Sequence, residues 1–227
     1  MTPKPDRQFS QSDQLKLAAI MSNRRDVRGN NFLPDPVSDE DIQTLLQAAV
    51  SAPSVGYSQP WSFVVVRDET IKNKVANSFA EENARAERLF QNDRREHYAS
   101  MKLEGIREAP VNIAVFYTPS NTSVLGQNSM PETGEYSVAC AIQNIWLMAR
   151  VMNIGVGWVS ILNPDTVKSI LRSPPEHKLI GYLCVGYVNE FYDRPELETL
   201  GWQSRKPLED MVHYDEFTDG PPSVMTN

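Results

Sequence analysis

Residues 135–153 are the segment that most constrains how this chain can fold, because apolar side chains recur around nearly the whole circumference of a helix there. These side chains are Val138, Ile142, Ile145, Trp146, Ala149 and Met152. A surface helix keeps one polar face, whereas a helix that is apolar almost all round is buried in a core or in a subunit interface. We therefore expect this helix to lie at the centre of the fold or between two subunits.

Short apolar strands and helical patterns alternate along the rest of the chain. We expect strands at residues 63–66, 111–117, 156–162 and 178–188. We expect helices at residues 14–22, from Ser38 to Pro53, over most of 70–108 and after Asn163. Ser38, with Asp41 three residues later, is typical of a helix N-cap, and Asn163 followed by Pro164 is typical of another. The continuous run 63–66 indicates a strand buried on both faces, and strands separated by helices favour a layered arrangement.

The composition excludes several classes of protein. The 227 residues include 22 Lys and Arg against 29 Asp and Glu, a formal net charge of −7, and the pI of about 5.1 argues against a nucleic-acid-binding surface. No apolar run is long enough to span a membrane, and the first residues lack the apolar core of a signal peptide. We therefore expect a cytoplasmic protein with a single domain over residues 1–227 and no membrane segment.

The cysteine and histidine residues indicate neither a disulfide nor a metal site. Cys140 and Cys184 lie alone in apolar segments, so we expect two buried thiols. His97, His177 and His213 are scattered, without the spacing of metal ligands.

Three polar segments are expected to lie outside the core. Residues 81–108 contain seven acidic and six basic side chains, which indicates a solvated and mobile helical segment. Residues 118–134 form a long loop rich in Thr, Pro, Ser, Asn and Gly, and loops of this length usually have a function. Residues 189–227 form a polar C-terminal arm with few core signals.

Four segments carry residues suited to binding a ligand. In Arg24-Arg25-Asp26-Val27-Arg28, three guanidinium groups within five residues can hold a phosphate, although a solvated charge cluster is the alternative. The small residues and prolines of segment 52–61 let a ligand approach the backbone, unless this is a plain connecting loop. Glycines in segment 155–160 would let a flat ring lie on a strand, and segment 204–209 is a cationic pair or a surface turn.

Together these segments resemble the nitroreductase superfamily of flavin proteins over roughly residues 18–210. The matches are an RRSxR-like motif at 24–28, a PSxxNxQPW-like loop at 53–61, a GxGxxW-like turn at 155–160 and a late arginine, Arg205, shortly before a proline. The resemblance implies an α+β fold in which a mixed central sheet is surrounded by helices. It also implies a homodimer that binds FMN at the subunit interface.

The resemblance further implies a flavin site assembled from all four segments. Its residues would be Arg24, Arg25, Asp26, Val27, Arg28, Pro53, Ser54, Val55, Gln59, Leu103, Gly157, Trp158, Val159, Ser160 and Arg205. The arginines would hold the phosphate, Gln59 would reach the polar edge of the ring, and segment 157–160 would lie beside it. Residues 81–108 would form a lid that excludes water. Leu103 would contact the flavin from the lid side, or else pack in the core.

Two departures from the usual pattern point to one branch of the superfamily. The chain has Asp26 where the family usually has Ser, and Tyr57 where it usually has Asn. With these departures the motifs resemble the branch whose members use reduced FMN and O₂ to break the flavin itself into 5,6-dimethylbenzimidazole, the lower ligand of vitamin B12, and erythrose 4-phosphate. The substrate would then be FMNH₂, supplied by a separate flavin reductase.

This branch would give Asp26 and Ser160 catalytic roles. A carboxylate near the ribityl C1′ suits a proton acceptor, and the Ser160 hydroxyl can hydrogen-bond the flavin or its oxygen adduct. The alternatives are an Arg–Asp ion pair for Asp26 and a hydroxyl satisfied by backbone for Ser160.

Other functions are compatible with the same motifs. They are an NAD(P)H-dependent FMN nitroreductase or flavin reductase, a reductive dehalogenase, and a non-enzymatic flavin-storage or sensor protein. Asp26 argues against the reductases, which rarely need a carboxylate at that point.

Overall fold

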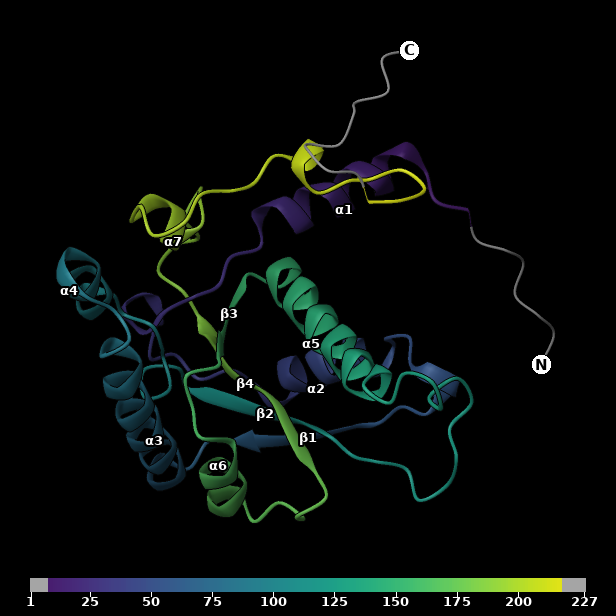
Figure 1. Ribbon diagram of the computed structural model, residues 1–227, viewed down its shortest axis with the longest axis horizontal. Coiled ribbons are helices and arrows are strands. Elements are labelled where there is room, and N and C mark those ends of the chain that lie inside the picture. Colours follow the sequence, from purple (N-terminus) through teal and green to yellow (C-terminus); the bar gives the residue numbers. More distant parts are fainter. Residues whose placement is uncertain (1–7, 218–227) are drawn as a thin grey trace. The chain divides into compact units, whose positions relative to one another are not determined.

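The computed structural model describes residues 8–217 and divides the chain into two compact units, Met1–Phe191 and Tyr192–Asn227. The first unit contains one sheet with helices on both faces (Figure 1). Within residues 8–217, no helix is long and apolar enough to cross a membrane.

Four strands form the sheet in the order β1-β2-β4-β3. They are β1 (Trp61–Val66), β2 (Val111–Tyr117), β3 (Ile154–Val159) and β4 (Lys178–Tyr187). Each ladder between them is antiparallel, so the mixed sheet that the resemblance implies is not found in residues 8–217. Within that range, the parallel pairing is limited to an isolated bridge between Asp26 and Val156 at the β3 edge. The strand expected at 156–162 begins and ends earlier, because the chain turns after β3, where the Leu162 N–H donates to the Ser160 carbonyl at 3.0 Å.

Strand β1 corrects one expectation, because it is not buried on both faces. It pairs only with β2, so it is an edge strand, and Val65 is 38% exposed. A short run of Val and Phe is equally compatible with an edge and a central strand, because position in the sheet depends on pairing with distant segments.

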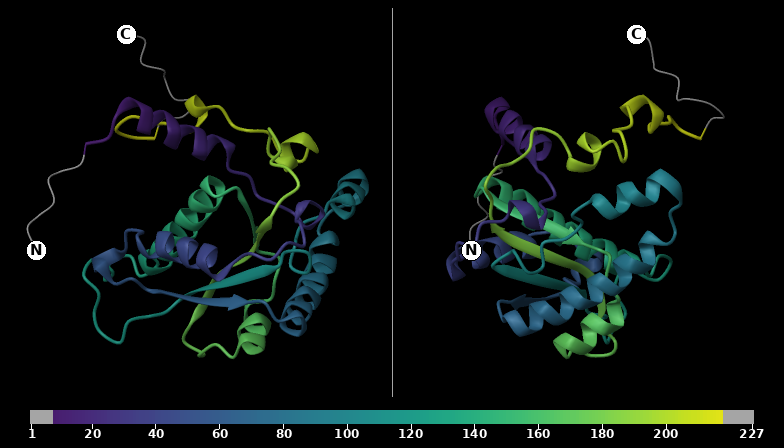
Figure 2. Two further views of the ribbon diagram at one scale, coloured as in Figure 1. Left: turned by 180° about the vertical axis from the view of Figure 1, so that it is seen from behind. Right: turned by 90° about the vertical axis from the view of Figure 1, so that its left-hand side faces the viewer.

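Helices cover both faces of the sheet. The helices of the first unit are α1 (Gln11–Asn23), α2 (Asp39–Val50), α3 (Glu69–Glu87), α4 (Asn92–Ser100), α5 (Thr133–Val151) and α6 (Pro164–Leu171). Helices α2 and α5 pack on one face, while α3 and α6 pack on the other (Figures 1 and 2). The second unit contains the short helix α7 (Glu196–Thr199).

The expected N-caps are confirmed by hydrogen bonds. The Ser38 hydroxyl accepts from the Asp41 N–H at 3.0 Å at the start of α2, and the Asn163 side chain accepts from the Thr166 N–H at 2.9 Å at the start of α6. Pro164 occupies the first turn of α6, where its missing N–H costs nothing.

Helix α5 is central, as its sequence predicts, but one of its faces remains exposed. Ile142, Ile145 and Ala149 are fully buried against α2 and the sheet. Tyr136 and Val151 are more than half exposed on the outer face. Cys140, one helical turn after Tyr136, lies exposed there as well, so the expectation of two buried thiols is wrong for Cys140 and confirmed for Cys184.

Candidate flavin site

The backbone of segment 24–28 is attached to strand β3. The Val27 N–H donates to the Val156 carbonyl at 3.1 Å, and the Trp158 N–H donates to a carboxylate oxygen of Asp26 at 2.9 Å. A Cβ at Gly157 would overlap the Val27 carbonyl oxygen, so only glycine allows this approach. The structure therefore brings two of the four expected segments, 24–28 and 157–160, into contact.

Helix α5 holds the same segment from the other side. The indole N–H of Trp146 donates to the Arg25 carbonyl at 3.1 Å, and the guanidinium carbon of Arg24 lies 4.6 Å from the Trp146 ring centroid. The Arg25 guanidinium donates to the Ser22 carbonyl at 2.7 Å, at the end of α1. The three arginines of the motif thus lie on one short, firmly held stretch of chain.

Asp26 is paired with Arg28 and has a raised pKa. The carboxylate forms an ion pair with Arg28 and also accepts from the Trp158 N–H. Burial raises the pKa of Asp26 from its ordinary value, while the charge of Arg28 and the Trp158 N–H oppose that rise. The ion pair expected as the alternative is therefore present, and the same carboxylate is also more basic than an ordinary aspartate.

Arg28 also connects the site to the end of the expected lid. Its second terminal nitrogen donates to the Leu103 carbonyl at 2.9 Å, and the Gly29 N–H donates to the Glu104 carbonyl at 2.9 Å. Glu104, which is 6% exposed, accepts from Lys102 at 2.6 Å. Leu103 thus lies beside the arginine motif, and its contact with a flavin stays a prediction.

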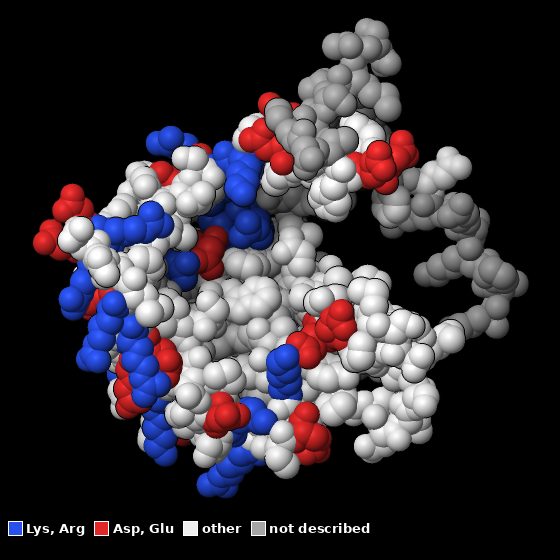
Figure 3. Space-filling model, in the orientation of Figure 1, with Lys and Arg blue, Asp and Glu red and all other residues white. Residues whose placement is uncertain are grey.

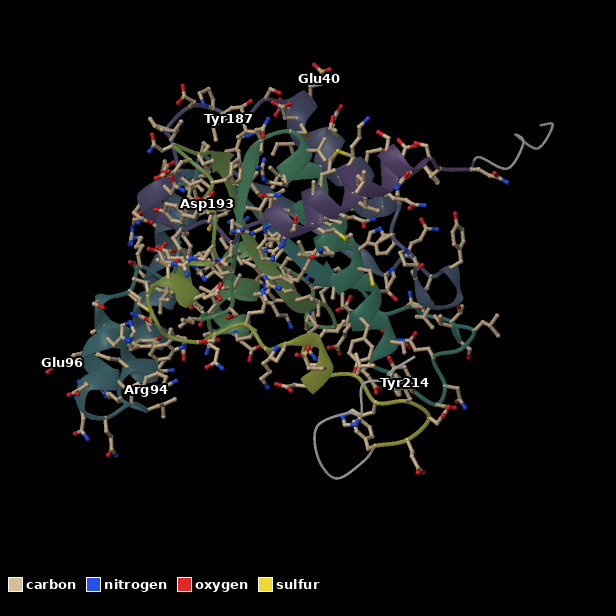
Figure 4. The ribbon with its side chains drawn as sticks, turned by 90° about the horizontal axis from the view of Figure 1, so that it is seen from above. Glu40, Arg94, Glu96, Tyr187, Asp193 and Tyr214 are labelled. Atoms are coloured by element: carbon tan, nitrogen blue, oxygen red, sulfur yellow. The ribbon has the colours of Figure 1, made fainter. Side chains whose placement is uncertain are left out.

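The outer part of the expected lid consists of the end of α3 and of α4. The Tyr98 hydroxyl donates to Asn83 at 2.8 Å, and its ring stacks on Phe90 with a centroid distance of 5.0 Å. Arg94 and Glu96 lie on the outer surface of α4 (Figure 4). Acidic and basic side chains alternate over the α3 and α4 side of the molecule (Figure 3).

The last residues of the expected lid belong to the core instead. Ile106 is fully buried, and Glu104 is nearly so. A lid over the whole of 81–108 would therefore disturb the core, and the lid that we predict is shorter than this range.

Ser160 follows β3 directly and is exposed. Its carbonyl accepts from Leu162, but its hydroxyl has no hydrogen bond to the residues between 8 and 217. The alternative expected for Ser160, a hydroxyl bonded to the backbone, is therefore not found.

Segment 53–59 lies at the opposite end of α5. The Val55 N–H donates to the Ser137 hydroxyl at 3.1 Å, near the start of the helix. Ser137 and Trp146 are separated by nine helical residues, which corresponds to roughly 13 Å along the helix axis. A single chain therefore does not bring Pro53, Ser54, Val55 and Gln59 to the arginine motif.

The backbone of this loop is held in an uncommon conformation. Tyr57 and Gln59 have φ angles of 54° and 48°, in the left-handed region that few non-glycine residues adopt. The Gln59 N–H donates to the Ser54 hydroxyl at 3.1 Å, and Tyr57 is 82% exposed. Backbone strain of this kind is found preferentially at functional positions.

Gln59 also lines a cavity of about 320 Å³ beneath the loop after β2. Tyr117, Ser120 and Gln127 contribute to it and to an adjoining hollow of about 620 Å³. In the sequence, the signal for these cavities was limited to the length of the 118–134 loop.

Arg205 lies exposed in the second unit, after α7. Its place in the phosphate clamp stays a prediction. Between residues 8 and 217, no three His, Cys, Asp or Glu side chains are grouped as metal ligands.

Sequence reasoning missed Trp146 and Glu104 as parts of the site. Trp146 was assigned to the core by its helical spacing, yet a largely buried indole N–H needs an acceptor, and this requirement was the available signal. Glu104 was counted among solvated charges, and no local pattern distinguished it.

Comparison with known proteins identifies the family. The model of the nitroreductase family matches residues 21–187. The chain belongs to the nitroreductase family. A 5,6-dimethylbenzimidazole synthase of Rhodospirillum rubrum is 46% identical over 201 residues, which cover 88% of this chain and 94% of that protein.

Two solved structures have the same fold as this chain. A BluB-like flavoprotein from Clostridium difficile matches with a TM-score of 0.67 at 23% identity, covering 88% of this chain and 99% of the other. An iodotyrosine deiodinase bound to FMN and 3-iodo-L-tyrosine matches with a TM-score of 0.70 at 22% identity, covering 88% and 100%. The expected α+β nitroreductase fold is thereby confirmed.

Proposed function

We propose that this protein fragments reduced FMN with O₂ to 5,6-dimethylbenzimidazole and erythrose 4-phosphate. The identity of 46% to a 5,6-dimethylbenzimidazole synthase, over nearly the full length of that protein, supports this reaction. The structural observation that carries it is Asp26, a largely buried carboxylate of raised pKa inside an arginine motif. A nitroreductase that only passes electrons through its flavin has no evident use for such a base.

The residues present fit FMN as the substrate. Arg24, Arg25 and Arg28 supply positive charge on one short segment for the phosphate. Gly157 keeps β3 close to the motif, so that the flavin ring can lie beside residues 157–160. Reduced FMN brings the electrons that activate O₂.

Asp26, Ser160 and Arg28 have separate roles in the proposed reaction. Asp26 accepts a proton from the ribityl chain near C1′, where its raised pKa makes it a better base than an ordinary aspartate. The Ser160 hydroxyl, which has no hydrogen bond to residues 8–217, would bond the flavin or its oxygen adduct. Arg28 orients Asp26 and ties the end of the lid to it.

The separation of the two half-sites supports a homodimer. Segments 24–28 and 53–59 lie at opposite ends of α5, so a second copy is needed to bring one against the other. Apolar side chains are exposed on α1 and α5, including Leu15 at 65%, Met21 at 50% and Tyr136 at 55%. Such a surface is typical of a protein interface, and a twofold axis would complete two sites at once.

The remaining parts of the proposal concern the electron source and the organisation of the chain. A separate flavin reductase supplies FMNH₂, and the reaction takes place in the cytoplasm, where the free thiols Cys140 and Cys184 stay reduced. The chain acts as a single nitroreductase-like domain, with a lid within residues 81–108 and a C-terminal arm at 189–227 that carries Arg205.

Incubation of the protein with reduced FMN in air tests the reaction. Loss of flavin together with a benzimidazole product, followed by chromatography, is the expected result. Intact flavin with consumption of NAD(P)H would show a reductase instead. Dehalogenation of 3-iodo-L-tyrosine would show a reductive dehalogenase, and bound, unchanged flavin a storage or sensor protein.

A further inference from the structure

Two side chains of α5, one helical turn apart, hold the backbone that leads into the arginine motif. The Trp146 indole N–H donates to the Arg25 carbonyl at 3.1 Å, and Arg150 donates to the Asn23 carbonyl at 3.0 Å. Residues four apart lie on the same side of a helix, so this side of α5 acts as a fixed support for segment 23–25.

Trp146 differs from Arg150 because its ring also contacts a charged group of the motif. The guanidinium carbon of Arg24 lies 4.6 Å from the ring centroid, within the range of a cation–π interaction. The Trp158 ring, 6.2 Å from that of Trp146 and tilted by 53°, packs beside it. One side chain thus holds the Arg24 guanidinium by its face and the Arg25 carbonyl by its edge.

We propose that Trp146 is a positioning residue that orients Arg24 for the phosphate of the flavin. The inference rests on the proposed function to the extent that the phosphate belongs to FMN. A long arginine side chain loses much conformational freedom when it binds an anion. Stacking on Trp146 restricts that freedom before the ligand arrives, and preorganisation of this kind strengthens binding.

A purely structural role for Trp146 predicts a different effect of its loss on flavin affinities. The side chain is partly buried and packs against the core formed by α2, α5 and the sheet. If it only filled space, its loss would weaken the binding of every flavin equally. If it orients Arg24, its loss weakens only the binding that depends on the phosphate.

The test compares FMN with riboflavin, which lacks the phosphate. The dissociation constants of both oxidised flavins are measured by fluorescence quenching for the wild type and for Trp146→Leu. We expect the FMN constant of Trp146→Leu to rise about 3- to 30-fold, the range of a partly desolvated cation–π contact. The riboflavin constant should change less than twofold. An equal change for both flavins overturns the proposal.

A double-mutant cycle identifies Arg24 as the group through which Trp146 acts. After Arg24→Gln, the additional change Trp146→Leu should leave FMN affinity unchanged within twofold. Additive losses overturn the proposal. Phe63→Leu is the matched control, because Phe63 is a partly buried aromatic residue packed against the same core but on strand β1. It should not alter the selectivity for FMN over riboflavin.

Trp146→Phe extends the test to a variant with a small change in volume. The phenyl ring keeps an aromatic face but loses the N–H. We therefore expect a two- to fivefold loss of FMN affinity and no change in riboflavin affinity. Equal losses for the two flavins would contradict the proposal, even if Trp146→Leu did not fold. A wild type that binds both flavins equally would overturn the phosphate clamp and this inference together. Intact selectivity without benzimidazole would overturn the proposed reaction alone.

Discussion

Asp26 carries a negative charge among the arginines of segment 24–28, where we expect a phosphate to bind, and its pKa is nevertheless raised. Its ion-pair partner Arg28 also donates a hydrogen bond to the Leu103 carbonyl. Burial raises its pKa more than these contacts lower it. The ion pair with Arg28 orients the carboxylate, so pairing and catalysis are compatible roles for the same group.

The substitution Asp26→Asn separates these roles. The amide keeps the size and the hydrogen bond from Trp158 but removes the basicity. We expect FMN to bind as well or better, because a negative charge near the phosphate is gone, whereas benzimidazole formation falls by about 10²–10⁴-fold. Flavin affinity and single-turnover product are measured together. Product formation within about threefold of wild type would leave Asp26 as an ion-pair partner only.

If Asp26 is the base, its raised pKa predicts the pH dependence of the reaction. A base must be deprotonated to act, so the rate should fall as the pH drops through the pKa of Asp26. Because burial raises that pKa, and a bound phosphate raises it further, the acid limb should lie above the ordinary aspartate value of about 3.9. The pH–rate profile of a single turnover measures this acid limb. If the residual rate of Asp26→Asn showed the same acid limb, the limb would belong to another group.

At the scale of whole elements, the connection between α3 and β2 has two parts with different roles. Residues 104–109 are anchored: Ile106 is buried, and the Asn112 side chain donates to its carbonyl at 2.9 Å. Helix α4 contacts mainly α3, and its outer surface carries exposed charges. An element with few core contacts can move without unfolding the rest.

Replacement of residues 90–100 by a short Gly-Ser linker tests the lid. FMN should remain bound, because segment 24–28 and the Leu103 carbonyl are left intact. Without the lid, water and O₂ reach the reduced flavin freely, so we expect reoxidation with release of peroxide in place of benzimidazole. Peroxide and benzimidazole are quantified after a single turnover. Benzimidazole at the native rate would show that α4 has no part in the chemistry.

At the scale of the whole molecule, the two groups of proposed site residues are attached to different ends of one helix. Val55 is attached near the start of α5, and Arg25 is attached near its end. The exposed residues Tyr136, Cys140 and Val151 lie on the outer face of the same helix. Helix α5 is thus central in the fold of this chain, and it also carries the exposed face that the proposed homodimer would use.

Subunit mixing tests whether each site takes residues from two chains. Arg24→Ala and Gln59→Ala should each be nearly inactive as homodimers. A mixed dimer would contain one site with both substitutions and one site with neither, so mixing should restore up to about half of the wild-type activity per mixed dimer. Absence of any recovery in dimers shown to have exchanged subunits, or full activity of a monomer in sedimentation, would rule out a shared site.

The sequence by itself determined the local structure and the motifs of individual segments. The strand 111–117, the caps at Ser38 and Asn163 and the central role of helix 135–153 follow from side-chain periodicity and from hydrogen bonds between near neighbours, so they could be predicted. The family motifs likewise identified segments 24–28 and 157–160, which the structure joins through hydrogen bonds of Val27 and Trp158.

Contacts between distant segments are what only the tertiary structure decided. Arg28 and Leu103 are 75 residues apart, and their hydrogen bond joins the arginine motif to the end of the proposed lid. The edge position of β1, the exposure of Cys140 and the separation of segment 53–59 from the arginine motif also depend on how whole elements pack. Each of these features is set by the pairing of strands and the rotation of α5 against its neighbours, to which periodicity within a single segment is insensitive.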